Sequence, residues 1–327
     1  MRRALHPTVW AFLAWLLLLG VNLAFTPGFF SIEVRDGRFY GSLIDVLNHS
    51  SPVLLAALGM TLVIATKGVD LSVGSVVAIS GAVAALMVTK GQAPLPTIVA
   101  VSVGVGLALG LWNGLLVSVF GIQPMVATLV LMVSGRGIAQ LLTDGQIITF
   151  QDPGLASVAG GSLLGLPNPV VVAACGLGVV AALARWTAFG TMVEAVGDNE
   201  RAAHLAGVPT RWVKLGAYAV CGVGSAIAGL IVCSYTKAAD ANNAGLYLEL
   251  DAILAVVAGG TAMTGGRFTL VGTVVGALIL QTLTTTILTK GVPVQWTLVV
   301  KAVAVLVVCL LQSDPFRRTV LSRRSAA

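Results

Sequence analysis

Side chains that commonly perform catalytic chemistry are few and scattered in this sequence. The three histidines, His6, His49 and His204, are far apart, and no H-E-x-x-H pair is present to hold a metal ion. No stretch matches the G-x-x-x-x-G-K-[ST] loop that holds nucleotide phosphates, and no G-x-S-x-G nucleophile elbow occurs. We therefore expect no ATP hydrolysis by a P-loop, no metal hydrolase chemistry and no catalytic residues in this chain.

Charged side chains gather instead in residues 185–214, with the sequence RWTAFGTMVEAVGDNERAAHLAGVPTRWVK. Asp198 or Asn199 is suited to cap a short helix by accepting from its free amide groups. Gly207 can take the left-handed conformation that ends a helix, and Pro209 prevents its continuation. A capped helix between apolar runs is typical of a surface that another protein grips. The alternative is a solvated connector between two membrane spans.

A few polar residues lie inside apolar runs, where they could meet a neutral, hydroxyl-rich solute. Arg136 is the best candidate for an ionisable group within the membrane, where it could face a cavity or extend to an interface. Asn113, Gln123 and Thr128 are further candidates for a translocation path, the last two flanking a proline that disturbs helical hydrogen bonding. Each could equally bond a neighbouring helix.

The elements that must position these residues are membrane helices, as the composition of the chain indicates. Of 327 residues, 57% are hydrophobic and only 10% are charged, with a mean hydropathy of +0.96. Soluble domains average roughly 25% charged residues. The apolar runs are continuous rather than alternating, so we predict an all-α polytopic protein forming a single membrane domain over residues 1–327, and not a β-barrel.

The apolar runs predict about ten spans. They cover residues 8–26, 51–66, 72–89, 95–119, 122–142, 168–186, 213–235, 252–264, 269–289 and 297–312. The segments 51–66 and 252–264 are shorter than the roughly 20 residues that a spanning helix needs, so we expect them to be broken or re-entrant. Rows of glycines at four-residue steps, such as Gly106, Gly110 and Gly114, predict close helix packing within one bundle.

The distribution of basic residues orients the spans. With both termini in the cytoplasm, twelve of the 19 lysines and arginines lie inside, five lie outside and two lie within spans. This asymmetry follows the positive-inside rule, and it explains the net charge of +6 without invoking nucleic acid. The charged stretch therefore becomes a cytoplasmic loop over residues 186–212, while residues 27–50, 143–167 and 236–250 face outward.

The acidic residues near the spans bear on an ion-coupled mechanism. Carboxylates at mid-membrane would mark proton or sodium coupling. The candidates Asp70, Asp144, Glu249 and Asp251 all fall at predicted span ends. An ion-coupled secondary transporter of a small polar solute therefore remains the alternative, but a weaker one.

Several stretches in order resemble a known family of permeases. They are GMTLVIATKGVDLSVGSVVAISGA, LWNGLLVSVFGIQPMVATLVLMVSGRGIAQLLTDGQ, EAVGDNERAAHLAGV and ELDAILAVVAGGTAMTGGR. The chain resembles the permease subunit of bacterial ATP-binding-cassette sugar importers of the ribose, xylose and galactofuranose type, from about residue 41 to 312. The stretches GRFYGSLIDVLN and ADANNAGLYLELDAI are most similar to the galactofuranose type.

The resemblance implies a multi-pass protein of the bacterial inner membrane that moves a monosaccharide by alternating access. It implies a cytoplasmic ATPase that holds the ATP and Mg²⁺, a second permease chain, identical or different, and a periplasmic sugar-binding protein. It also assigns ATPase contact to the charged stretch. The residues expected to contribute are Glu194, Gly197, Asn199, Glu200, Ala202, Ala203 and Gly207.

Two residues depart from the family pattern. Lys67 stands in TKGVDLS where TGGIDLS is usual, which makes that turn less permissive. Asp198 lies at a position where we expect variation. Which face of the capped helix is gripped stays open, because a small stripe of Ala202, Ala203 and Ala206 and the charged pair Glu200 and Arg201 both qualify.

Overall fold

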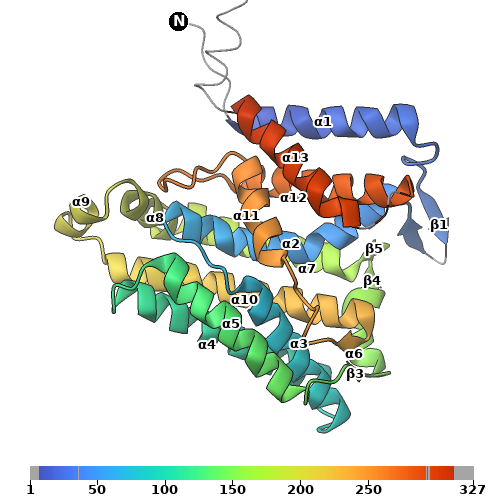
Figure 1. The fold of residues 1–327 in the computed structure, drawn as a ribbon, viewed down its shortest axis with the longest axis horizontal. Helices are drawn as coiled ribbons and strands as arrows, with labels where there is room; N and C mark the ends of the chain where they lie inside the picture. The colour runs from blue at the N-terminus through green and yellow to red at the C-terminus, as the bar shows by residue number, and fades with distance from the viewer. Residues whose placement is uncertain (1–6, 36, 292, 294, 313–327) are drawn as a thin grey trace, which may run out of the picture.

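The computed structural model describes residues 7–312, except 36, 292 and 294. Its main helices lie side by side in one bundle (Figure 1). In chain order they are α1 (Pro7–Phe25), α2 (Ser42–Ala65), α3 (Val73–Thr89), α4 (Leu95–Ser118), α5 (Pro124–Leu142), α7 (Asn168–Trp186), α10 (Thr210–Thr236), α11 (Leu248–Ala258), α12 (Leu270–Thr289) and α13 (Gln295–Gln312). Seven helices of the described chain are long and apolar enough to cross a membrane. The prediction of an all-α polytopic membrane protein is confirmed.

The two ends of the bundle carry different small elements (Figure 1). At one end lie α8 (Phe189–Asp198) and α9 (Glu200–Leu205). At the other end lie α6 (Pro153–Gly160) and three two-stranded pairs, all antiparallel. They are β1 (Glu33–Arg35) with β2 (Arg38–Tyr40), β3 (Ile148–Thr149) with β6 (Ala238–Ala239), and β4 (Ser162–Leu163) with β5 (Leu166–Pro167). The predicted loops 143–167 and 236–250 are therefore joined to each other through β3 and β6.

Six arginines of the orientation count (Arg2, Arg3, Arg317, Arg318, Arg323 and Arg324) lie outside the described residues.

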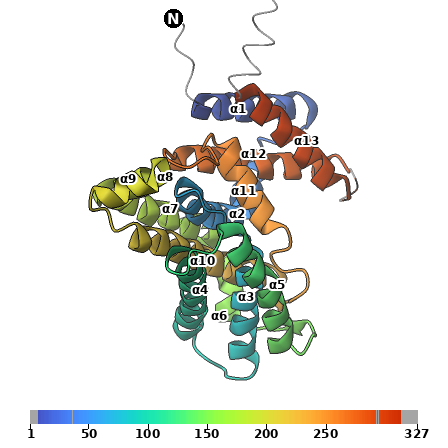
Figure 2. The same cartoon turned by 60° about the vertical axis from the view of Figure 1, so that its left-hand side comes forward.

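Helix α10 occupies the centre of the bundle and packs on α2, α3 and α4. Both views place α3, α4 and α5 on one side of α10, and α1, α12 and α13 beyond α2 on the other (Figures 1 and 2). The predicted glycine row lies at the joint between α4 and α10. A side chain added at Gly106 would overlap Gly222 and Ala226, so the close packing expected of this row is confirmed.

The prediction that residues 51–66 form a short, broken span is wrong, because α2 runs unbroken for 24 residues from Ser42. Its first three turns mix polar residues with apolar ones, which hides them from a search for continuous apolar runs. The structure satisfies these polar groups locally: the hydroxyls of Ser50 and Ser51 each donate to Leu47 O at 2.9 Å. Tyr235 of α10 donates to Asn48 O at 2.8 Å. Pro52 is accommodated inside the helix.

The prediction of a short segment near 252–264 is confirmed by α11, which has only 11 residues. It begins at Leu248, directly after a turn in which Tyr247 adopts a left-handed conformation with φ of 64°. Glu249 in its first turn is buried, and its carboxylate lies against Gly74 in the first turn of α3. The N-termini of two short helices therefore meet inside the bundle, as in the discontinuous helices of many transporters.

Candidate coupling surface and translocation path

The charged stretch folds into α8 and α9. Asn199 caps α9, since its side-chain oxygen accepts from the amide of Ala202 at 3.0 Å. Gly207 follows with a left-handed φ of 86°, and the next helix begins after Pro209. Glu200 in the first turn of α9 forms an ion pair with Lys214 of α10 at 2.6 Å. The predicted capped helix is confirmed as α9, and α8 is a second helix that was not predicted.

The predicted coupling residues divide into an outward and an inward group. The exposed residues are Asn199, Glu200, Ala202 and Gly207. Glu194 is half-buried, whereas Gly197 and Ala203 are buried. Ala203 packs in a small core with Ala65 of α2 and Val213 of α10. The small stripe is therefore split, with Ala203 turned into the protein and Ala202 and Ala206 turned out.

Two exposed apolar side chains within this stretch were not among the predicted residues. Leu205 is 83% exposed at the end of α9, and Trp212 is 73% exposed in the first turn of α10. A hollow of about 380 Å³ lies between these positions. Its lining residues are His204, Gly207, Val208, Pro209, Thr210, Arg211 and Trp212. A leucine within a charged loop was the signal that could have identified this surface.

Gly197 joins the charged stretch to two other parts of the chain. A side chain at this position would overlap the carbonyl oxygen of Ala65, at the end of α2, and the backbone of Gly266, in the loop between α11 and α12. That loop is itself bonded to α2, because the amide of Gly266 donates to Ala65 O at 2.9 Å. The end of α8 is therefore packed directly against the end of α2 and the loop that follows α11.

The two residues that depart from the family pattern contact each other. Lys67 adopts a left-handed conformation with φ of 64°, which is the conformation that the usual glycine would take without strain. Its Nζ donates to the backbone oxygen of Asp198 at 3.1 Å. Lys67 thus adds a link between the loop after α2 and the end of α8.

A comparison of two variants separates the strain at Lys67 from its hydrogen bond. Both Lys67→Gly and Lys67→Ala lose the bond to Asp198, but only alanine keeps the left-handed strain. We expect Lys67→Ala to be less stable than Lys67→Gly by about 1 kcal/mol. Thermal unfolding of the purified protein in detergent measures the difference. Equal midpoints for the two variants would contradict a strained turn at Lys67.

Two of the four predicted path residues hold the loop between α2 and α3. Asn113 of α4 donates to Ser72 Oγ at 2.8 Å, and Ser72 in turn donates to Asp70 at 2.6 Å. Thr128 of α5 donates to Val69 O at 3.2 Å. Asn113 and Thr128 are both fully buried. In this conformation they position the backbone of the loop, and Gln123 lies exposed just before α5.

Arg136, the fourth predicted path residue, reaches across to the segment between α10 and α11. Its guanidinium donates to Ala241 O at 3.0 Å and to Ala244 O at 2.6 Å. One turn further along α5, Gln140 donates to Asn242 at 2.6 Å. We name residues 240–247 the outer segment. The side chains of α5 hold it by three hydrogen bonds.

Asp240 organises the beginning of the outer segment. Its carboxylate accepts from the amides of Asn242 and Asn243 at 2.9 and 3.1 Å. The side-chain amide of Asn243 also donates to it at 2.7 Å, and this bond is the main reason that the pKa of Asp240 lies below its usual value. Asp240 therefore remains ionised at neutral pH and keeps the turn formed.

An ion pair between α11 and α13 was not foreseen. Lys301 Nζ lies 2.8 Å from Asp251 Oδ2, and the two side chains are 13% and 22% exposed. Asp251 lies at a predicted span end and Lys301 within another predicted span, and the 50 residues between them conceal the pairing in the sequence. Together with Arg136 and Glu249, this pair places ionisable groups of α5, α11 and α13 within the bundle.

Comparison with known proteins identifies relatives along almost the whole chain. Residues 42–309 match a family described as branched-chain amino acid transport system / permease component. The galactofuranose transporter permease protein of Escherichia coli K12 is 52% identical over 95% of this chain and 91% of its own length. The fructose import permease protein of Bifidobacterium longum is 39% identical over 93% of this chain and 87% of its own. The ribose import permease protein of Escherichia coli K12 is 36% identical over 92% of each chain. No solved structure matches the chain significantly.

Proposed function

This chain belongs to the family of transport-system permease components, and from that membership we propose that it is the membrane subunit of an ATP-driven importer for a monosaccharide. It is a multi-pass permease and not itself the catalytic subunit of its family's transport systems. In the proposal, a cytoplasmic ATPase binds ATP and Mg²⁺ and docks on α8 and α9. A binding protein delivers the sugar to the opposite end of the bundle, at the outer surface of a bacterial inner membrane.

The contact of Gly197 with Ala65 and Gly266 is the observation that most supports this mechanism. Closure of the ATPase on ATP would displace α8, and the displacement would pass to α2 and to the loop that follows α11. Helix α11 carries Glu249 and Asp251 at its far end. The outer segment would then open as the inner end closes, which gives alternating access. ATP binding shifts the permease between its two conformations only as far as the ATP-bound ATPase binds one of them more tightly than the other.

A furanose sugar is the proposed substrate class. The relatives are named for galactofuranose, fructose and ribose, and each of these sugars can form a five-membered ring. The polar groups near the outer segment, including Arg136, Gln140 and Asn242, offer hydrogen bonds to hydroxyls without demanding a charged substrate. In the proposal these groups line the path, whereas Asn113 and Thr128 support it from behind.

Transport by the reconstituted complex tests the proposal. The permease, its ATPase and its binding protein would be placed in proteoliposomes and offered a panel of radiolabelled pentoses and hexofuranoses. We expect uptake that requires ATP and the binding protein, and that continues when proton and sodium gradients are abolished. Uptake that needs no ATP and stops with either gradient would favour the alternative, an ion-coupled secondary transporter.

The pairing of Asp251 with Lys301 weighs against that alternative. A carboxylate that couples transport to an ion must exchange its partner during the cycle. Asp251 already has a lysine at 2.8 Å, and Asp70 is occupied by hydrogen bonds from the amide and hydroxyl of Ser72 at 2.9 and 2.6 Å. Neither group is available to a proton or sodium ion without breaking one of these contacts.

Removing the guanidinium of Arg136 is expected to reduce uptake about tenfold. Arg136→Gln cannot maintain both bonds to the outer segment, and a hydrogen bond to a charged group contributes about 1.5–3 kcal/mol. ATPase association should be unchanged, because Arg136 is remote from α8 and α9. The measurement is sugar uptake alongside co-purification of the ATPase. Gln123→Ala, at an exposed position before the same helix, is the control and should transport normally.

A further inference from the structure

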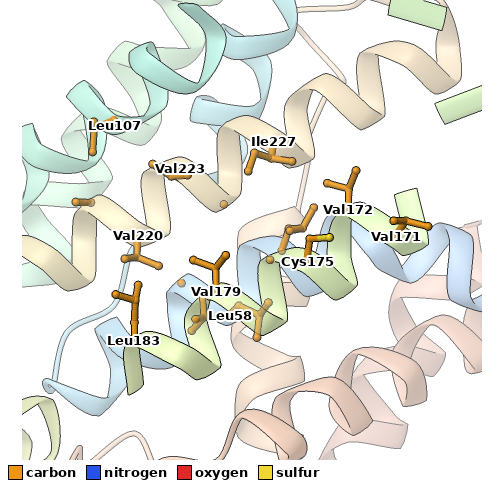
Figure 3. A pocket seen from close by; sticks show the side chains of 16 residues that line it. Leu58, Leu107, Val171, Val172, Cys175, Val179, Leu183, Val220, Val223 and Ile227 are labelled. Carbon is orange, nitrogen blue, oxygen red and sulfur yellow. The ribbon is translucent and has the colours of Figure 1, made fainter. Parts of the chain in front are cut away.

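A groove lies between α2, α7 and α10. It encloses about 530 Å³. Figure 3 shows Val179 and Leu183 of α7 pointing toward Val220 of α10, with Leu58 of α2 between the helices. The groove exists because small residues draw α10 onto α2, while α7 contacts α2 and leaves its other flank open.

The lining of the groove is hydrocarbon along its whole length. Its residues are Leu55, Leu58, Gly59, Leu107, Val171, Val172, Cys175, Gly176, Val179, Val180, Leu183, Ala219, Val220, Val223, Gly224 and Ile227. The thiol of Cys175 is the only polar side chain among them. A sugar would lose its hydrogen bonds to water here without replacement, so the groove is unsuited to the substrate. An acyl chain makes no hydrogen bonds to water and would therefore lose none here.

One end of the groove leads to two exposed tryptophans near α8. Trp186 follows Val179 and Leu183 by seven and three positions, and Trp212 precedes Ala219 by seven, so both continue the helix faces that line the groove. They are 87% and 73% exposed. Tryptophans in such positions mark the level of lipid headgroups.

Positive charge lies at the same level. Arg185 and Arg211 immediately precede the two tryptophans and are exposed. Neither forms an ion pair with another residue of the described chain. A guanidinium group at headgroup level attracts phosphate, and it does so more strongly when the lipid carries net negative charge.

A second permease chain is less suited to this groove. Under the proposed function, Arg136 and Gln140 of α5 and the outer segment line the path, which two permease chains would enclose between them. Helix α7 packs on α2, α6 and α8 rather than on α5. A pair related by a two-fold axis has one self-complementary interface, so an interface on the polar side leaves α7 facing the bilayer.

We propose that this groove is a binding site for an anionic phospholipid. One acyl chain lies between α7 and α10, and the headgroup lies at Trp186 and Trp212 beside Arg185 and Arg211. Helix α7 leads into α8 across two residues, Thr187 and Ala188. The lipid therefore supports the helix that carries the proposed ATPase surface.

Fluorescence quenching at Cys175 tests this proposal. Cys175 is exposed, whereas Cys221 and Cys233 are buried, so a bimane label would attach to it in the complete importer once Cys309 is replaced by serine. The reconstituted complex would contain a small fraction of phosphatidylglycerol or phosphatidylcholine with brominated acyl chains. We expect phosphatidylglycerol to be enriched at the label about fivefold over phosphatidylcholine.

Three variants make the result specific. A label at Leu17→Cys with Cys175→Ala reports bulk lipid, because Leu17 is 72% exposed on α1, and it should show no such preference. The double variant Arg185→Gln with Arg211→Gln should abolish the preference at Cys175 without altering the core. Val223→Trp, which fills the groove, should reduce quenching by both lipids.

Two outcomes would overturn the proposal. Equal quenching by both lipids at Cys175 and at Leu17→Cys means that the groove holds only bulk lipid. Disulfide formation between Cys175 residues of two permease chains, with little quenching, means that a second copy covers it. Neither result depends on sugar transport, so the proposed function stands or falls separately.

Discussion

Replacing Gly197 with alanine is expected to reduce ATP-driven uptake by at least about tenfold, because one methyl group is already too large for the joint that it occupies. Its added carbon would overlap Ala65 O and the amide of Gly266, which are backbone atoms that cannot rotate away. Relief requires α8 to separate from α2 or the loop after α11 to shift. Overpacking of this kind costs roughly 1–3 kcal/mol.

Gly104→Ala is the matched control for that prediction. Gly104 lies within α4 and has no atom within 4 Å of the added carbon, so alanine there should raise helix stability by about 1 kcal/mol and leave uptake intact. Uptake and ATPase activity stimulated by the binding protein would be measured for both variants. Normal coupling in Gly197→Ala would mean that α8 transmits its movement by another contact.

The second large effect is expected at the ion pair between α11 and α13. Asp251→Ala leaves the ammonium group of Lys301 unpaired at a position only 13% exposed, which should destabilise the protein by about 3–5 kcal/mol. The double variant Asp251→Ala with Lys301→Met removes both charges and should recover most of that loss. Thermal unfolding and membrane yield of the three proteins measure the effect.

The double variant also decides what the pair is for. Restored stability together with restored uptake would show that the pair serves packing alone. Restored stability without uptake would show that α11 and α13 exchange this contact during transport. A single variant Asp251→Ala as stable as the unmodified protein would contradict the ion pair itself.

The sequence predicted those elements that depend on local pattern. Apolar runs identify the spans, and Asn199, Gly207 and Pro209 define the capped helix that the structure confirms. The glycine row at Gly106 predicted a tight joint within the bundle, because few other residues permit such an approach. Each of these signals lies within a few turns of one helix.

The features that the sequence did not predict depend on which helix faces which. Ala202 and Ala203 are adjacent and have the same side chain. Only the placement of α9 against α2 shows that Ala203 is buried and Ala202 is exposed. The start of α2 was not predicted because polar residues interrupt its apolar sequence. Their hydrogen-bond partners, Tyr235 and the backbone of α2 itself, are visible only in the folded structure. Asp251 and Lys301 could be paired only once α11 and α13 were placed side by side.

The shortness of α11 also constrains how the protein is made. With 11 residues and two carboxylates in its first turn, α11 is too short and too polar to be recognised as a membrane span during synthesis. It must enter the bilayer together with α12, as a helical hairpin joined by the loop that contains Gly265 and Gly266. A nascent chain that ends before α12 would therefore leave α11 outside the membrane.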